Sequence, residues 1–392
     1  MTNDTFVLTE LNLTHYRGFS KICLPLHPGI NVLIGPAGAG KTAVLGGAAI
    51  VLGAWFLGIP KIDSRWILDE EMQRIATPKG MVRRGVTEVK ATGNIQGIEG
   101  VVWSRTRGDG KTTTKEAKPL KALAKALDHK VAGMQNVTLP MIGYYGVGRS
   151  WGDRYMGVVK KSEEIKLPDN YGRYLGYREA LDPAADERQL LGCLKRMHEV
   201  GDLSRLALFD IITVGMQSVR ATRWDPVLQD IILEFVDGKI IPMHLLSDCD
   251  RNLCAMFGDL AMRCMTLNPH LLGGAPSQTP GVVLIDEIEL HLQPRDQRLI
   301  LNQLAAQFPC IQFIVTTASP YVVSFPSQFP VSKLTDSGIE RVDYSVPLGL
   351  EDTAEIMDIL DGYEDASDGF SIQHNVSGMH EHIEMLSAYC EG

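Results

Sequence analysis

The sequence lacks paired cysteines and a secretory signal. Its seven cysteines are scattered along the chain without a C-x-x-C pair, which argues against a disulfide framework or a cysteine-ligated zinc site. The N-terminal sequence M-T-N-D-T has no basic start of the kind that opens a secretory signal. We therefore expect a cytoplasmic protein.

A hydrophobic run long enough to cross a membrane is also missing. The stretch that most resembles a membrane span, residues 43–59, contains seventeen residues without a charge. As a helix it would extend about 25 Å, at ~1.5 Å per residue, which is less than the ~30 Å hydrocarbon core of a bilayer. The stretch directly follows a glycine-rich loop, so we expect a buried helix and no membrane span.

Basic residues are missing from the end of the chain. Residues 342–392 contain twelve Asp or Glu and no Lys or Arg, whereas residues 79–130 contain twelve Lys or Arg and five Asp or Glu. Two interpretations stay open. In one, both segments are ordinary solvated surfaces. In the other, residues 342–392 are an acidic docking segment and residues 79–130 are a basic surface for nucleic acid. The net charge of -9 argues against general affinity for nucleic acid but not against a local basic face.

The hydrophobic pattern indicates an α/β protein. A strand pattern ends at a glycine-rich loop, an uncharged helix follows it, and a second strand and helix set comes late in the chain. We expect strands within residues 6–34, 81–107, 282–287 and 311–317, and helices within residues 43–59, 118–130, 184–219 and 295–308.

The glycine-rich loop matches the phosphate-loop pattern G-x-x-x-x-G-K-[ST] in full, in the expected context between a strand and a helix. Glycines in such a loop let backbone N–H groups converge on phosphate at a helix N-terminus. The lysine would reach the β- and γ-phosphates, and the threonine hydroxyl would hold Mg²⁺. The residues predicted to bind nucleotide here are Gly35, Pro36, Ala37, Gly38, Ala39, Gly40, Lys41, Thr42 and Ala43.

Two carboxylates follow the apolar run V-V-L-I late in the chain. Asp286 is placed to bind Mg²⁺ together with Thr42, and Glu287 to orient or deprotonate an attacking water. With Lys41, Glu287 forms the predicted catalytic set, and ATP and Mg²⁺ are the predicted ligands. The loop does not read G-x-G-x-x-G, which argues against a Rossmann dinucleotide fold.

About 240 residues separate Lys41 from Asp286, so a large segment is inserted between the two halves. Six motifs follow one another along roughly residues 6–330: L-N-L-T-H-Y-R-G-F-S, the phosphate loop, L-P-M-I-G-Y-Y-G-V-G-R, L-S-D-C-D-R-N-L, L-I-D-E-I-E-L-H-L-Q-P and I-V-T-T-A-S-P. In this order they resemble the ABC-type ATPase heads of the SMC/RecF/OLD group. Within that group the chain resembles the compact bacterial anti-phage ATPases of Septu and retron-associated systems, the PtuA type.

The resemblance implies a P-loop NTPase fold, with a mixed central sheet, an antiparallel β lobe and an inserted helical lobe. It also implies a domain order along the chain. We expect the N-terminal part of the head with the phosphate loop and β lobe at 1–150, a helical insertion at 151–240, the C-terminal part of the head at 241–335, and an acidic segment for partner docking at 336–392.

The resemblance further implies a homodimer or higher homo-oligomer that closes around ATP. Ser247 would open a helix and face the γ-phosphate held by a second copy, as a catalytic residue; the same serine also suits a simple helix N-cap. Arg149 would bind nucleotide near the loop that senses Mg²⁺ and γ-phosphate, although an ordinary surface arginine fits this position too. Residues 289–294 would line the dimer interface.

Two positions depart from the family pattern. Ala318 stands where the strand usually ends in a histidine that contacts the γ-phosphate and the attacking water, and Ser319 beside it cannot carry positive charge. The signature reads L-S-D-C-D-R where L-S-x-G-x-R is usual, so Cys249 adds a side chain at the phosphate face and Asp250 a negative charge. Because losing one transition-state donor costs about 10²- to 10³-fold in rate, we expect slow hydrolysis.

Three functions follow from these observations. The first is a regulatory ATPase that controls a partner effector, a nuclease, in bacterial anti-phage defence. The second is a RecF- or SMC-like repair ATPase that binds duplex DNA through residues 79–130. The third is a scaffold that binds nucleotide without hydrolysing it. A self-contained nuclease is disfavoured, because only 68 residues follow Ser324 and the histidines among them, at 374, 380 and 382, suit surface positions.

Overall fold

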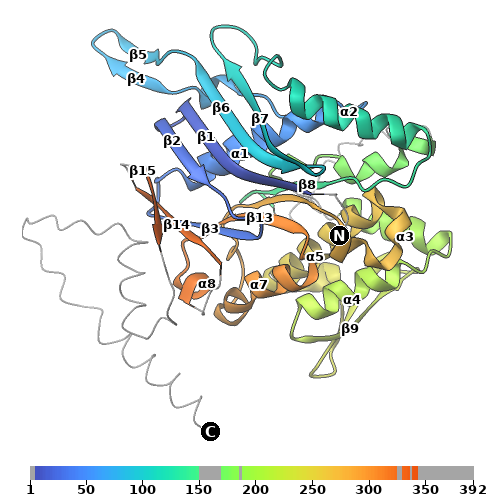
Figure 1. Ribbon diagram of the computed structural model, residues 1–392. Helices are drawn as coiled ribbons and strands as arrows, with labels where there is room; N and C mark the ends of the chain where they lie inside the picture. The colour runs from blue at the N-terminus through green and yellow to red at the C-terminus, as the bar shows by residue number, and fades with distance from the viewer. Residues whose placement is uncertain (1–4, 150–168, 185–187, 325–328, 336–337, 343–392) are drawn as a thin grey trace, which may run out of the picture. The chain divides into compact units, whose positions relative to one another are not determined.

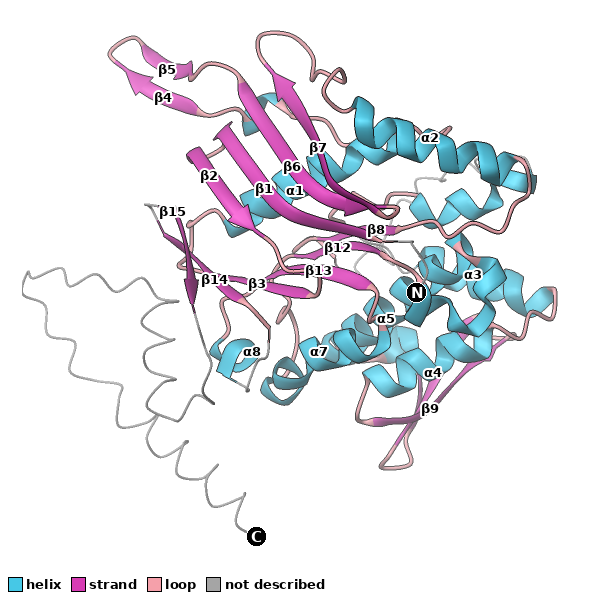
Figure 2. Ribbon diagram, in the orientation of Figure 1, coloured by secondary structure: helices cyan, strands magenta, loops and turns pink. Residues whose placement is uncertain are grey.

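A central parallel sheet and an antiparallel sheet enclose one long helix in the computed structural model (Figures 1 and 2). The structure describes residues 5–149, 169–184, 188–324, 329–335 and 338–342, all within one compact unit. Most of the predicted acidic docking segment, residues 343–392, lies outside the described residues, as do residues 150–168 of the chain.

The central sheet has six strands, and all of its neighbouring pairs are parallel except the pair at one edge. The four strands β3, β13, β12 and β8 are buried along their whole length, as expected for a parallel sheet covered on both faces. The predicted mixed sheet is therefore confirmed. In spatial order the strands are β15 (Gly338–Val342), β14 (Val331–Thr335), β3 (Ile30–Ile34), β13 (Ile311–Thr316), β12 (Gly281–Ile285) and β8 (Met141–Tyr145).

The predicted antiparallel lobe is a second sheet, in the order β2-β1-β6-β7. Its two central strands, β1 and β6, alternate buried and more exposed residues, because only one face of the sheet packs on the core. A short hairpin, β4–β5, extends from this lobe and is almost fully exposed (Figure 2). The strands are β1 (Phe6–Tyr16), β2 (Phe19–Pro25), β4 (Arg74–Thr77), β5 (Gly80–Arg83), β6 (Thr87–Ile95) and β7 (Ile98–Arg107).

Helix α1 (Lys41–Phe56) packs between the two sheets, touching β1, β6 and β7 on one side and β12 and β13 on the other. Every residue from Ala43 to Phe56 is buried, which explains why this helix carries no charge beyond its first residue. Glycines on α1 let the helix approach the antiparallel sheet closely: a Cβ at Gly47 would lie 2.5 Å from the Leu13 side chain on β1. The predicted buried helix is confirmed, and no described helix has the length and apolarity needed to cross a membrane.

The predicted helical insertion contains helices but also a small sheet. Strands β9, β10 and β11 pair antiparallel. They follow the helical pattern of residues 184–219, and strands this short give only a weak periodic signal. The elements here are α3 (Arg188–Glu199), α4 (Arg205–Gly215), β9 (Val219–Asp225), β10 (Asp230–Phe235) and β11 (Ile240–Pro242).

The remaining helices cover the edges and outer faces of the sheets (Figure 1). The longest, α5, packs against α3, α4, α6 and β8, and α2 packs against α1 and β7. These helices are α2 (Lys118–Ala132), α5 (Asp248–Leu267), α6 (Ala275–Gln278), α7 (Pro294–Gln307) and α8 (Pro320–Ser324), with short 3-10 segments η1 (Asp69–Glu71), η3 (Asp169–Tyr177), η4 (Met243–Leu245) and η5 (Pro269–Gly274).

One buried glutamine joins the two sheets. Gln312, on β13, is fully buried and its Nε2 donates to the carbonyls of Leu8 and His27, both at 2.7 Å. Its Oε1 accepts the Leu8 N–H at 2.8 Å. A single side chain thus satisfies three backbone groups that the junction of the sheets buries.

Replacing this side chain should destabilise the fold. Gln312→Leu would keep the volume but leave the buried N–H and carbonyl of Leu8 without this partner, while the His27 carbonyl keeps its bond from Asn31, so we expect the free energy of unfolding to fall by about 2 kcal/mol or more. Urea denaturation followed by circular dichroism measures it. Gln303→Leu, on the half-buried side of α7, is the matched control. Equal stability of the two variants would show that Gln312 does not hold the sheets together.

Candidate nucleotide-binding site

The glycine-rich loop connects β3 to α1 and forms an open backbone cradle. Gly35, Gly38 and Gly40 have positive φ angles of 149°, 86° and 91°, which L side chains rarely adopt. A Cβ at Gly40 would also lie 2.5 Å from the Phe19 ring. The N-terminus of α1 has no side-chain cap and no acidic residue in its first turn. Its first N–H groups and the positive end of the helix dipole are therefore available to an anion.

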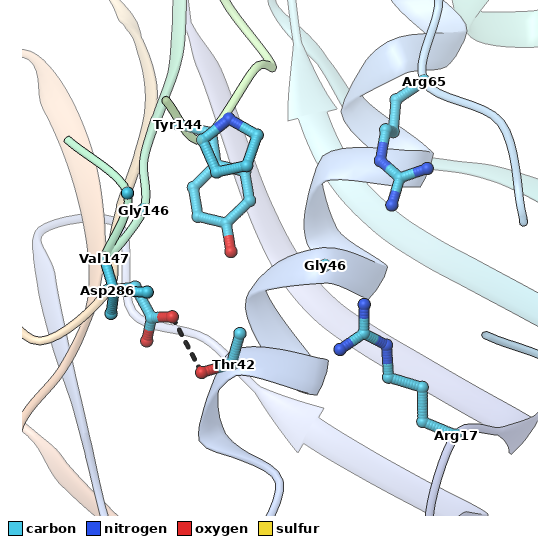
Figure 3. A pocket seen from close by; sticks show the side chains of 10 residues that line it. Arg17, Thr42, Gly46, Arg65, Tyr144, Gly146, Val147 and Asp286 are labelled. Atoms are coloured by element: carbon cyan, nitrogen blue, oxygen red, sulfur yellow. Dashed lines mark hydrogen bonds between the residues drawn. The ribbon is translucent and has the colours of Figure 1, made fainter. Parts of the chain in front are cut away.

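The two halves of the predicted site meet at this loop. The Thr42 hydroxyl donates to Asp286 Oδ2 at 2.7 Å, across 244 positions of sequence (Figure 3). The Thr316 hydroxyl donates to the other oxygen, Oδ1, at 2.6 Å. Asp286 is almost fully buried. Thr42 and Asp286 supply hard oxygen atoms side by side, the donor type that Mg²⁺ prefers, so these residues fit the predicted metal.

Lys41 is held back against its own loop. Its Nζ donates to the carbonyls of Gly35 at 2.5 Å and Pro36 at 3.1 Å. Burial lowers the pKa of this lysine, and Glu289, Glu287 and Asp286 oppose that shift. An anion bound in the cradle would compete with the two neutral carbonyls for the Lys41 ammonium group. Its negative charge would also stabilise the protonated lysine.

Glu287 lies beside Asp286 in a strained conformation. Its φ is +46°, which is uncommon for a residue with a side chain and is often found at functional sites. The Thr316 hydroxyl accepts its N–H at 2.8 Å, which fixes the main chain while the side chain remains exposed. Burial, followed by the charges of Asp286 and Glu289, raises the pKa of its carboxyl. A carboxylate with a raised pKa suits a general base.

Arg149 is a buried brace and not a surface residue. It is 1% exposed, and its guanidinium donates to the carbonyls of Gly146 at 3.0 Å, Asp286 at 2.5 Å and Glu287 at 2.6 Å. Burial lowers its pKa to about 10. Arg149 therefore fixes the main chain of the acidic pair, and its contact with nucleotide stays a prediction.

Ser247 is the N-cap of α5, and its hydroxyl accepts the Asp250 N–H at 3.2 Å and donates to the Asp250 carboxylate at 2.7 Å. The N-cap interpretation is confirmed. The expectation that Cys249 adds a side chain at the phosphate face is wrong, because this residue is buried and its thiol donates to Asp296 on α7 at 3.7 Å. Burial raises the pKa of the thiol to about 11.

The strand β13 lies between β3 and β12, so the position after its end faces the centre of the site. The Ala318 N–H there donates to Glu289 Oε1 at 2.7 Å. Ser319 is buried, and its hydroxyl donates to Gln297 on α7 at 2.5 Å. Because its hydroxyl is already engaged, Ser319 does not take the place of a histidine.

A cavity of about 200 Å³ lies beside the Thr42–Asp286 pair and extends to two arginines that the sequence analysis did not single out. Figure 3 shows the guanidinium groups of Arg17 and Arg65 turned toward one another. Both bond the fully buried Glu71, at 3.0 and 2.6 Å. Arg17 belongs to the motif L-N-L-T-H-Y-R-G-F-S, but no local pattern joins it to Glu71, which lies in the short segment η1.

A protein-family model matches residues 97–324, more than half of the chain. Its description is "AAA domain, putative AbiEii toxin, Type IV TA system". The chain belongs to this AAA family. The match begins after the phosphate loop and includes Asp286, Glu287 and the signature helix.

Two curated proteins and one solved structure are similar to this AAA protein. Retron Vc95 probable ATPase of Vibrio cholerae serotype O1 biovar El Tor is 25% identical, over 83% of this chain and 72% of its own. Septu protein PtuA of Bacillus mycoides (strain KBAB4) is 55% identical over 40 residues, 10% of this chain and 6% of its own. A crystal structure of an Smc head bound to the C-winged helix domain of ScpA matches 88% of this chain and 99% of its own at 17% identity and a TM-score of 0.50. The last match confirms the fold class.

Other metal sites are not apparent in the part of the AAA protein that the structure describes, where no group of three or more His, Cys, Asp or Glu is arranged to hold an ion. The histidines at 374, 380 and 382 lie outside the described residues. Thr42 and Asp286 thus remain the predicted metal ligands.

Removing one of these ligands should make nucleotide binding insensitive to the metal. For Asp286→Asn we expect the Kd of ATP in the presence of Mg²⁺ to rise about 10- to 100-fold or more, with little change when EDTA is present. Titration with a fluorescent ATP analogue measures both values. Asp210→Asn, at an exposed position of α4, is the control. A variant that keeps the full Mg²⁺ effect would rule out Asp286 as a ligand.

Proposed function

We propose that this AAA protein binds Mg-ATP, dimerises around it and hydrolyses it slowly, and that this cycle controls a partner effector. The observation that carries the proposal is the 2.7 Å bond between Thr42 and Asp286. It joins the phosphate-loop helix to the acidic strand end, although the two lie 244 positions apart. Glu287 and Lys41 flank this pair, so the parts that phosphoryl transfer needs are gathered at one edge of one sheet.

The site residues have distinct roles in the proposed reaction. The loop N–H groups and Lys41, released from the Gly35 and Pro36 carbonyls, bind the β- and γ-phosphates. Mg²⁺, when bound, neutralises charge on the phosphate oxygens, and Thr42 and Asp286 would hold it. Glu287 accepts a proton from the attacking water as the new P–O bond forms and the bond from the γ-phosphorus to ADP breaks. Its raised pKa means that the rate falls as the pH drops toward acid values.

The slow rate follows from Ala318. In the proposed site the Ala318 position offers only a backbone N–H, which Glu289 already accepts at 2.7 Å, and the neighbouring Ser319 hydroxyl is bonded to Gln297. A transition-state donor is therefore missing from the subunit's own residues. Bound ATP then persists, and it serves chiefly to hold two copies together. The exposed Ser247 at the start of α5 would close over the γ-phosphate of the second copy.

The effector and its setting are inferred from similarity. The likeness to a retron ATPase and to Septu PtuA favours a role in bacterial anti-phage defence in the cytoplasm, with a nuclease as the controlled partner. In the proposed domain order of 1–150, 151–240, 241–335 and 336–392, the acidic last segment is the docking element for that partner. A nuclease encoded by a neighbouring gene that co-purifies with the ATPase would support this assignment.

A second candidate function has one observation in its favour. Helix α2 exposes Lys118, Lys121 and Lys125, which lie on one helical face because of their spacing. Such a row suits the phosphate backbone of duplex DNA. This candidate, a RecF- or SMC-like repair ATPase, shares the ATP site with the first. The third, a scaffold that binds ATP without hydrolysis, differs from both in the fate of the nucleotide.

The hydrolysis proposal predicts opposite effects for two variants. Ala318→His should raise phosphate release in dilute protein by about 10-fold or more, because it restores a donor, and Glu287→Gln should abolish release without weakening ATP binding. A continuous phosphate assay follows both. Ala122→His, at an exposed position of α2, is the control. A wild type with no turnover at all would favour the scaffold, and an Ala318→His variant no faster than wild type would refute the missing-donor account.

The DNA-binding candidate makes its own prediction about salt. If α2 contacts phosphates, replacing Lys118, Lys121 and Lys125 by Gln should reduce the slope of log affinity against log salt by about 2 to 3. Fluorescence anisotropy with a labelled duplex, with and without ATP, measures the slope. Our first proposal expects no ATP-dependent binding of duplex, so a steep slope that the triple variant flattens would favour the second candidate.

A further inference from the structure

A carboxylate and an imidazole form a pair next to the signature helix. Asp230, at the start of β10, is 5% exposed, and its Oδ2 lies 2.6 Å from Nδ1 of His244. The same oxygen accepts the His244 N–H at 3.2 Å, and Oδ1 accepts the Ile231 N–H at 2.8 Å. Both oxygens of Asp230 thus act as acceptors, which is the behaviour of an ionised carboxylate.

This pairing determines how the imidazole is presented. Because the carboxylate accepts from Nδ1, the proton of the neutral ring sits on Nδ1, and Nε2 carries the lone pair. The His244 side chain is 41% exposed while its partner is buried. A buried carboxylate that orients an exposed imidazole is the arrangement by which many sites keep a histidine ready to accept a proton or a hydrogen bond.

The pair is attached rigidly to Ser247. His244 belongs to η4, and Leu246 N donates to the Met243 carbonyl at 3.1 Å. Arg251, one turn into α5, donates to the carbonyls of Met243 and His244. Only two residues lie between His244 and Ser247, and both His244 and Ser247 are exposed. Whatever approaches the N-terminus of α5 therefore meets the imidazole as well.

We propose that His244 acts in trans, at the ATP site of a second copy, where its Nε2 accepts a hydrogen bond from the attacking water. This inference rests on the proposed function, in which Ser247 closes over the second copy's γ-phosphate. The water then has two acceptors: Glu287 of the subunit that binds the ATP takes one proton, and His244 of the other subunit holds the second hydrogen in place. The other subunit thus supplies the contact with the attacking water that the usual histidine makes, while the donor to the γ-phosphate stays missing, so turnover remains slow and depends on dimer formation.

Mixing two inactive variants tests the inference directly. Glu287→Gln lacks the base and keeps His244, whereas His244→Ala lacks the imidazole and keeps the base. Each alone should be slow, by about 10²-fold or more. A 1:1 mixture should recover about one quarter of wild-type turnover, because random pairing makes about half of the dimers mixed and each mixed dimer holds one complete site.

The results that would contradict this inference differ from those that would contradict the proposed function. If the wild type turns over but the mixture only averages its parents, His244 acts within its own chain or merely supports η4, and this inference is wrong while the proposed function stands. If the wild type binds ATP without turnover, both fail. His129→Ala, at an exposed position of α2, should behave as wild type in every assay.

Two further variants separate a positioning role from a structural one. Asp230→Asn should lower kcat about 10²-fold with little change in KM, because the ring loses its orienting acceptor. Adding Ala318→His to the His244→Ala chain should restore turnover from within the same subunit. Thermal melts that match the wild type exclude misfolding; an unchanged kcat in a folded Asp230→Asn protein would contradict the inference.

Discussion

The contact between Thr42 and Asp286 is the constraint on which the rest of the site depends. Thr42 belongs to the first turn of a helix that is buried from Ala43 to Phe56, and Asp286 follows a strand buried in the central sheet. Neither element can shift alone without disturbing close-packed neighbours. Thr316, on the strand between them, bonds both Asp286 and the backbone of Glu287. Three adjacent parallel strands thereby set the positions of the metal ligands and of the base at their carboxyl ends.

The same site is connected to the signature helix through buried polar bonds. The Tyr145 hydroxyl donates to Asp259 of α5 at 2.6 Å, and Arg263 of the same helix pairs with Asp259 at 2.7 Å. Tyr145 ends β8, and its carbonyl accepts the Asp286 N–H at 2.8 Å. Ser247 is the N-cap of α5, and Asp259 belongs to the same helix. A contact of Ser247 with another copy is therefore joined, through this helix and Tyr145, to the main chain of Asp286. This connection gives the proposed dimer a physical means to affect each ATP site.

The sequence was sufficient where a local pattern carries the chemistry. The phosphate loop, the acidic pair, the buried helix and most strands follow from glycine spacing and apolar periodicity. It was not sufficient where a role depends on distant contacts. Arg149 differs from a surface arginine only because the carbonyls of residues 146, 286 and 287 surround it. The burial of Cys249 against α7 and the cluster around Glu71 likewise arise from tertiary packing. The sheet β9–β11, with its Asp230–His244 pair, follows the helical pattern of residues 184–219, and its short strands give only a weak periodic signal.

The central claim is that residues far apart in sequence form one site for one Mg-ATP. Isothermal titration calorimetry of the wild-type chain with ATP and Mg²⁺ tests this claim most directly. The account predicts saturable heat with one nucleotide per chain, and loss of that heat in Lys41→Ala. A wild-type protein that is folded yet gives no heat of binding, or a Lys41→Ala protein that binds as well as wild type, would contradict it.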